Sequence, residues 1–318
     1  MTKISHVAAP NVSATSNTFS RRDAIILSIL VGFAVSLISY YVSSLIGHAG
    51  DFSWPLNAAR LLLQGENPYH RIDLGPKEFP ADVLLYPLPA LVLVMPFTIF
   101  PDPVALGLFH GLSAGLLAYG ICTKAPHLLP IFISAPFWMC ICYAQWSVLL
   151  TAFLLLPALN PLIVVKPTHL ISAFAFQSQP KNIIRIVIGI AVTCILTWPL
   201  LWSWPLDWLQ NLPKAHYTRQ IVAFSFPGCL VLIALLRWRE SSARLLVAMA
   251  LSPHFPIYDY VAIGLVPHNF KRSMIFAIGS WFIATIGAFT LDPYRVTVVY
   301  YLFAFVLLMT APKVIQQK

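Results

Sequence analysis

Long apolar stretches separated by short polar breaks run along almost the whole chain. The clear apolar runs are residues 24–46, 84–100, 103–122, 183–204, 221–236, 273–291 and 296–311. A membrane-spanning helix needs about 20 mainly apolar residues, and fewer where the helix is broken. The pattern therefore predicts an all-α integral membrane protein whose helices form one polytopic transmembrane bundle.

The middle of the chain, residues 128–179, is apolar almost throughout. Its interruptions are Pro136, Gln145, Pro157, Asn160-Pro161 and Lys166-Pro167. We divide it into three short spans near 128–143, 146–158 and 164–179, and a further pair near 244–253 and 259–268 flanks a proline-rich break. Residues 24–312 are thus expected to form a single domain of roughly 10–12 helices.

The basic residues predict how the chain lies in the membrane. Residues 1–23 are polar and end in Arg21-Arg22, which indicates a disordered cytoplasmic tail followed by an uncleaved first span. Residues 47–83 then form a long outer loop, and 313–318 form a second cytoplasmic tail. Counting on through the spans places the clusters at 237–244 and 271–272 inside.

Composition narrows the function classes. The chain is 58% hydrophobic and 10% charged, whereas soluble domains carry about 25% charged residues. The net charge of +9 comes from short clusters between apolar runs, so we exclude nucleic acid as a partner. The cysteines lack zinc spacing, and neither a Gly-rich phosphate loop nor a Ser-His-Asp arrangement stands out, which argues against a metalloenzyme or a nucleotide-driven pump.

The outer loop predicts a short surface helix. Apolar residues from Trp54 to Leu62 recur at helical spacing, Ser53 or Asp51 can cap the start, and Gly65 suits the end. Such an amphipathic helix is expected to lie on the membrane with its apolar face down. Asp51 then stands just before a helix N-terminus, whose dipole favours an ionised carboxylate. It suits a general base, with an ordinary helix-cap aspartate as the alternative.

Two further polar residues interrupt apolar runs. Lys166 follows Ile163-Val164-Val165 and precedes a proline. Charged residues inside the membrane are costly and are usually functional, although this lysine could also extend to the outer headgroups. Gln145 is the second candidate for the functional site, and the alternative is that it only forms hydrogen bonds between helices.

Several segments occur in the order found in one family. They are Gly50-Asp51-Phe52, Ala58-Ala59-Arg60, Leu62-Leu63, Gly65-Glu66-Asn67-Pro68-Tyr69, Tyr86-Pro87-Leu88-Pro89-Ala90, Ala144-Gln145, Lys166-Pro167-Thr168-His169-Leu170 and Ser252-Pro253-His254-Phe255-Pro256-Ile257-Tyr258-Asp259-Tyr260. Over roughly residues 45–265 the chain resembles the GT-C membrane glycosyltransferases of glycosyltransferase family 87. That family contains polyprenol-phosphate-mannose-dependent mannosyltransferases and related arabinofuranosyltransferases.

The resemblance implies inverting transfer of a mannose-like hexose, or of a pentose, from a polyprenyl-phosphate donor to a hydroxyl of a glycan or glycolipid. It implies no metal and no other cofactor, a bacterial inner membrane and a site facing the periplasm. By motif position the catalytic base is Asp51.

The remaining candidates are assigned to substrate binding. Lys166, His254 and Arg60 would meet the donor phosphate, with bulk lipid headgroups as the alternative for Arg60. Asp259 would orient His254 or pair with one of the other cations, and Tyr258 and Gln145 complete the set. A lipid-linked sugar flippase or other transporter, which usually shows an internal repeat, and a non-catalytic membrane scaffold remain the alternative functions.

Overall fold

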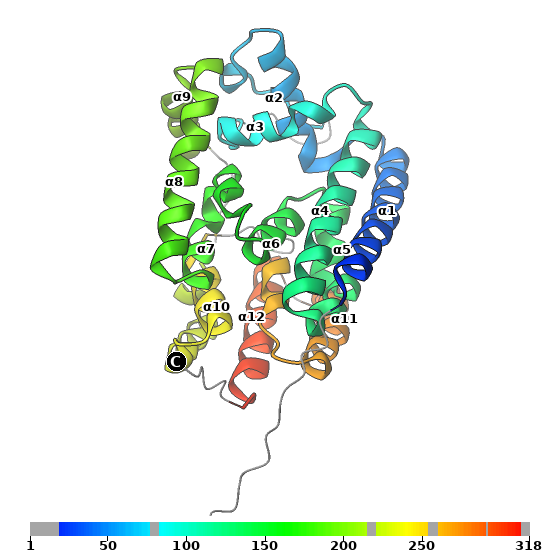
Figure 1. Cartoon of the computed structure of the whole chain (residues 1–318), viewed down its shortest axis with the longest axis vertical. Helices are drawn as coiled ribbons and strands as arrows, with labels where there is room; N and C mark the ends of the chain where they lie inside the picture. Colours follow the sequence, from blue (N-terminus) through cyan, green and yellow to red (C-terminus); the bar gives the residue numbers. More distant parts are fainter. Residues whose placement is uncertain (1–18, 77–82, 215–220, 254–259, 291, 313–318) are drawn as a thin grey trace, which may run out of the picture.

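The structure is a computed structural model that describes residues 19–76, 83–214, 221–253, 260–290 and 292–312, and its regular elements in these ranges are helices (Figure 1). The α-helices are α1 (Arg21–Ile46), α2 (Ser53–Leu63), α3 (Leu88–Val94), α4 (Asp102–Lys124), α5 (Ala135–Cys142), α6 (Ser147–Leu155), α7 (Leu170–Phe176), α8 (Pro180–Thr197), α9 (Trp204–Asn211), α10 (Ser241–Leu251), α11 (Phe270–Thr290) and α12 (Pro293–Met309). Short 3-10 helices join them: η1 (Gly50–Phe52), η2 (Pro68–His70), η3 (Met95–Phe97), η4 (Pro126–Ile133), η5 (Asn160–Val165), η6 (Pro167–His169), η7 (Trp198–Leu200), η8 (Leu212–Lys214), η9 (Val222–Phe224), η10 (Gly228–Arg237) and η11 (Val261–Leu265). The all-helical class predicted from the sequence is confirmed for the described residues.

Four of the described helices are long and apolar enough to cross a membrane. They are Arg21–Ile46, Asp102–Lys124, Pro180–Leu200 and Phe270–Phe289. Their lengths approach or exceed the roughly 20 residues that a hydrocarbon core of about 30 Å requires. The predicted runs in the middle of the chain form shorter elements, because prolines such as Pro130, Pro161 and Pro167 interrupt helical hydrogen bonding.

The pairing of α1 with α4 sets the direction of the bundle. The two helices run antiparallel and touch through small residues: Gly107 and Gly111 lie against Ser36, Gly111 also meets Gly32, and Gly115 lies against Ser28. A Cβ atom added to Gly111 would stand 2.7 Å from the Cβ atom of Ser36. Small residues of this kind let membrane helices approach closely, and here they bring the start of α4 to the end of α1.

The segment 84–100 was predicted to cross the membrane; the structure forms only a short apolar helix there, and the crossing stays a prediction. The first residue of α4, Asp102, accepts a hydrogen bond from Arg60 on α2, with Nη1 and Oδ1 2.7 Å apart. The apolar helix Leu88–Phe97 is only about 15 Å long at 1.5 Å per residue. The described residues between 47 and 101, which are 47–76 and 83–101, therefore lie at one end of the molecule, which we call the loop end.

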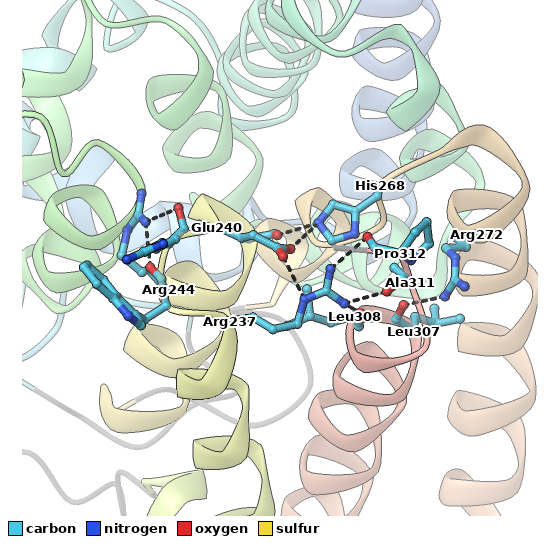
Figure 2. Close-up of polar contacts among 12 residues, drawn as sticks. Arg237, Glu240, Arg244, His268, Arg272, Leu307, Leu308, Ala311 and Pro312 are labelled. Atoms are coloured by element: carbon cyan, nitrogen blue, oxygen red, sulfur yellow. Dashed lines mark hydrogen bonds and ion pairs between the residues drawn. The ribbon is translucent and has the colours of Figure 1, made fainter. Parts of the chain in front are cut away.

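The opposite end, which we call the basic end, gathers the cationic clusters. Figure 2 shows Arg237 between Glu240 and the last turn of α12, where its guanidinium binds the carbonyls of Leu308, Ala311 and Pro312. Arg244 likewise binds the carbonyl of Ala175 at the end of α7. These arginines bind carbonyl groups at and just beyond helix C-termini, where backbone partners are few.

Lys124 lies at the basic end as well, since α4 ends beside the start of α1. The side of the membrane on which Lys124 lies stays a prediction.

The start of α1 differs by a few residues from the predicted tail. Ser20 is the N-cap of α1 and its Oγ accepts a hydrogen bond from the backbone N–H of Asp23 at 3.1 Å. Arg21 and Arg22 are therefore helical, and the remaining tail residues, 1–18 and 313–318, lie outside the described part of the chain.

Candidate functional site

Two tight turns far apart in the sequence meet inside the loop end. One precedes α2 and contains Gly50, and the other joins α5 to α6 and contains Ala144. Both have left-handed backbone, with φ of 53° at Gly50 and 56° at Ala144. A Cβ atom on Gly50 would stand 2.9 Å from that of Ala144. At position 50, glycine therefore suits both the conformation and the close approach.

This approach brings Gln145 to Asp51. The Gln145 side-chain amide donates a hydrogen bond to Oδ2 of Asp51 and a second one, at 3.2 Å, to the carbonyl of Tyr143. Cys140 Sγ contacts the Gln145 carbonyl at 3.4 Å. Gln145 is only 2% exposed and Asp51 is half-buried. The amide is thus held by its own turn and orients the carboxylate.

The predicted capping of α2 by Asp51 or Ser53 is not what the structure shows. Asp51 lies in η1, the N-cap position of α2 is Phe52, and its side chain makes no capping hydrogen bond. The predicted helix itself is confirmed, and Gly65 follows its end with φ of 80°. Its apolar face packs into the core of the protein, with Leu56 and Leu62 buried; contact of α2 with a membrane surface stays a prediction.

A cluster of aromatic side chains packs beneath the two turns. Phe52 stacks on Phe109 of α4 with ring centroids 4.5 Å apart, and Phe109 lies 5.0 Å from Trp146. Tyr86 in turn lies 5.4 Å from Trp146. Sequence reasoning missed Phe109 and Trp146, although Trp146 directly follows the candidate Gln145.

A second set of contacts ties the loop to α9. Tyr69 donates to the carbonyl of Tyr86 at 3.0 Å, and Trp208 donates to the carbonyl of Leu85 at 2.9 Å. Asp207 accepts hydrogen bonds from Asn67 at 2.8 Å and Ser203 at 2.7 Å. These bonds hold the described part of the loop against α9.

The charge of Asp207 depends on these bonds. Partial burial works to raise the pKa of Asp207, but the hydrogen bonds from Ser203 and Asn67 outweigh it, so the pKa lies below its ordinary value. The Asp207 carboxylate therefore stays ionised at neutral pH and keeps α9 attached to the loop.

Arg60 is engaged away from the Gln145 turn. Its guanidinium donates to Asp102 at 2.7 Å, to Asn57 at 3.0 Å and to the carbonyl of Phe100 at 3.0 Å. These contacts fasten α2 to the start of α4. A role for Arg60 in donor binding stays a prediction.

Lys166 lies half-buried at the junction of η5 and η6. The backbone break predicted at Lys166-Pro167 is confirmed, because Lys166 has φ of −140° and ψ of 85°. The preceding Ile163, Val164 and Val165 are buried. Lys166 therefore projects from non-helical backbone inside the apolar bundle, and its approach to Asp51 stays a prediction.

Three candidates, His254, Tyr258 and Asp259, lie outside the described residues. The flanks of their segment are well anchored. Ser252 donates to the carbonyl of Ala248 at 2.8 Å, and the hydroxyl of Tyr260 bonds to that of Thr297 at 2.7 Å. Ser252 thus lies at the C-terminal end of α10, and Tyr260 is bonded to α12.

Within the described ranges, no group of three or more His, Cys, Asp or Glu side chains has the arrangement of a metal site. No family model, no curated protein and no solved structure matches the chain. The chemistry of the Asp51 turn is thus the basis for any functional proposal.

Proposed function

We propose that the protein is a membrane glycosyltransferase in which Asp51 is the catalytic base. The donor would be a polyprenyl-phosphate sugar, with a mannose-like hexose or a pentose as the sugar. The acceptor would be a hydroxyl of a glycan or glycolipid. The observation that carries the proposal is the hydrogen bond from the Gln145 amide to the Asp51 carboxylate.

An amide donor suits a base better than a cationic donor would. An amide can donate a hydrogen bond but has no proton to give up, so it orients the carboxylate without protonating it. A general base contributes typically about 10²–10⁴-fold when it is positioned within hydrogen-bond reach. The packing of Phe52 against Phe109 and Trp146 holds the Asp51 turn in position.

The proposed reaction is a single inverting displacement. The acceptor oxygen attacks the anomeric carbon as the bond from that carbon to the donor phosphate oxygen breaks. The acceptor proton passes to Asp51, and the polyprenyl phosphate leaves with the bonding electrons. Lys166 and His254 are the proposed cationic or hydrogen-bonding partners of that phosphate, with Tyr258 and Asp259 beside them.

The distribution of charge supports a periplasmic site in a bacterial inner membrane. Arginine and lysine collect at the basic end, and cytoplasmic loops of membrane proteins carry such an excess. The Asp51 turn lies toward the opposite, loop end. With the basic end in the cytoplasm, the donor would reach Asp51 from the periplasmic leaflet.

The test is sugar transfer by the Asp51→Asn variant. Membranes containing the protein would receive radiolabelled polyprenyl-phosphate mannose or arabinofuranose, and label entering the glycolipid and glycan fractions would be measured. We expect transfer to fall at least about 100-fold. Glu66→Gln, which removes an exposed carboxylate of the same loop, should retain wild-type transfer. Wild-type transfer by Asp51→Asn would refute the base assignment.

A further inference from the structure

A groove of about 590 Å³ runs along the outside of α11 and α12, far in the sequence from the Asp51 turn. Its lining includes Phe270, Lys271, Met274, Ile278, Phe282 and Phe303. Apart from Lys271, the lining is apolar. The exposed fraction is 51% for Ile278 and 65% for Phe282. On a helix with the composition of a membrane span, such a face lies toward lipid.

The floor of the groove is shaped by a glycine and an aromatic pair. A Cβ atom on Gly279 would stand 2.6 Å from the Phe303 ring. Phe303 stacks almost parallel on Phe276, with centroids 5.9 Å apart and an interplanar angle of 14°. The missing side chain therefore lets the Phe303 ring lie flat against α11, and the stacking keeps it there.

The groove carries a cation where it reaches the basic end. Lys271 is the second residue of α11 and is exposed. Its neighbour Arg272 is bound to the end of α12, where it donates to the carbonyl oxygens of Leu307 at 2.5 Å and Thr310 at 2.7 Å (Figure 2). Lys271 belongs to the lining of the groove and is exposed at the N-terminus of α11, which is the positive end of the helix dipole.

We propose that this groove binds an anionic phospholipid, with one acyl chain along the apolar floor and the phosphate at Lys271. The charge at the mouth selects an anionic headgroup over a zwitterionic one, because a cation near the membrane surface attracts anionic lipid. The apolar floor accepts hydrocarbon and offers nothing to a polar ligand. The site is independent of glycosyl transfer, since α11 and α12 contribute no residue to the Asp51 turn.

Native mass spectrometry of the detergent-purified full chain tests the proposal. The protein would be mixed with equal amounts of dioleoyl phosphatidylglycerol and dioleoyl phosphatidylcholine, and the first bound lipid would be identified. We expect the wild type to retain the anionic lipid about fivefold more than the zwitterionic one. Lys271→Gln should bring that ratio close to one, whereas Lys271→Arg should keep it.

Two further variants separate the groove from general surface charge. Lys181→Gln removes an exposed lysine at the start of α8, outside the groove, and should leave the ratio unchanged. Met274→Trp fills the groove without changing charge and should lower retention of both lipids. Equal retention of the two lipids by the wild type, or equal losses in the Lys271→Gln and Lys181→Gln variants, would overturn the proposal. Displacement of the bound lipid by substoichiometric polyprenyl phosphate would also overturn it.

Discussion

Single side chains at the loop end divide into those that hold the Asp51 turn and those that hold the scaffold around it. Gln145 contacts Asp51 directly, whereas Arg60 binds Asp102 and nearby carbonyls. Both are buried or half-buried polar groups, and breaking either set of bonds leaves partners unsatisfied. Their loss should nevertheless have different consequences, one for turnover and the other for stability.

Replacing Gln145 should impair turnover more than binding. In the Gln145→Leu variant the Asp51 carboxylate loses the donor that orients it, and we expect kcat for sugar transfer to fall about 10–100-fold with a smaller change in KM. Gln177→Leu is the matched control, because Gln177 donates its amide to the carbonyl of Leu154 at 2.7 Å, away from Asp51. Equal losses in the two variants would contradict a positioning role for Gln145.

Replacing Arg60 should lower stability. Arg60→Gln leaves Asp102 without its cation and Phe100 without its donor, so the free energy of unfolding in detergent should fall by about 1–3 kcal/mol. The double variant with Asp102→Asn should lose less than the sum of the single variants. If Arg60 instead binds the donor phosphate, transfer would fall while the unfolding free energy stayed the same.

At the scale of elements, two kinds of contact hold the bundle together. The seam between α1 and α4 depends mainly on the close packing of glycines against small residues, with one buried hydrogen bond between Ser39 and His110. The joint between η10, α10 and α12 at the basic end is electrostatic, with Arg237 and Glu240 almost fully buried. A packed seam responds to added volume, and a buried polar joint responds to protonation.

The α1–α4 seam predicts a graded response to alanine. At Gly111 an added Cβ atom would lie 2.7 Å from the Ser36 side chain, whereas at Gly115 the nearest atom, the Ser28 carbonyl oxygen, lies 3.2 Å away. Gly111→Ala should therefore lower the free energy of unfolding by about 1–3 kcal/mol, and Gly115→Ala should lower it less. Reversible unfolding in mixed detergent measures both, and the opposite order would show that the seam can open at Gly111.

The basic-end joint predicts that stability rises with pH through His268. Burial lowers the pKa of His268, the Glu240 charge raises it, and Arg237, His127 and Arg272 lower it further. The folded protein thus binds fewer protons here than the unfolded chain, whose histidine pKa is about 6.5. The contribution of His268 to the free energy of unfolding should therefore be fully present above the unfolded pKa. It should be lost as the pH falls toward the folded pKa.

The His268→Gln variant provides the comparison. The introduced amide would keep a hydrogen-bonding group beside Ser242 and Glu240, whose present contacts with His268 are 2.8 and 3.2 Å. The thermal unfolding temperature, measured between about pH 5 and 8, should rise less steeply with pH for this variant than for the wild type. The same pH dependence in both proteins would exclude His268 as the group that makes stability depend on pH.

At the scale of the whole molecule, the two ends differ in charge. The loop end carries the long polar connection and the carboxylates Glu66, Asp73, Asp102 and Asp207, whereas arginines and lysines dominate the basic end. Because cytoplasmic loops carry an excess of Lys and Arg, we predict that this axis sets both the insertion direction and the face on which the proposed chemistry takes place.

Cysteine labelling tests that axis. The five native cysteines are free, so they can be replaced without breaking a disulfide. In intact cells a membrane-impermeant maleimide should label Glu66→Cys, whereas Lys124→Cys should react only after the membrane is permeabilised. Labelling of both positions in intact cells would contradict the antiparallel placement of α1 and α4 across the membrane.

The sequence by itself determined the features that depend on local chemistry. Runs of apolar residues identify α1, α4, α8 and α11, because the cost of burying a segment in hydrocarbon depends on its own side chains. Gly65 and Lys166-Pro167 mark their backbone breaks, since φ preferences and a missing N–H act within a residue or two.

Only the tertiary structure decided which segments meet and on which side they lie. Hydropathy cannot tell that Leu88–Phe97 stays at the loop end, because a short apolar helix can be covered by protein as well as by lipid. Likewise, nothing local links Gln145 to Asp51 or Arg60 to Asp102. Those contacts follow from the close steric fit of glycine-lined surfaces, which is a property of two segments together and is absent from either one alone.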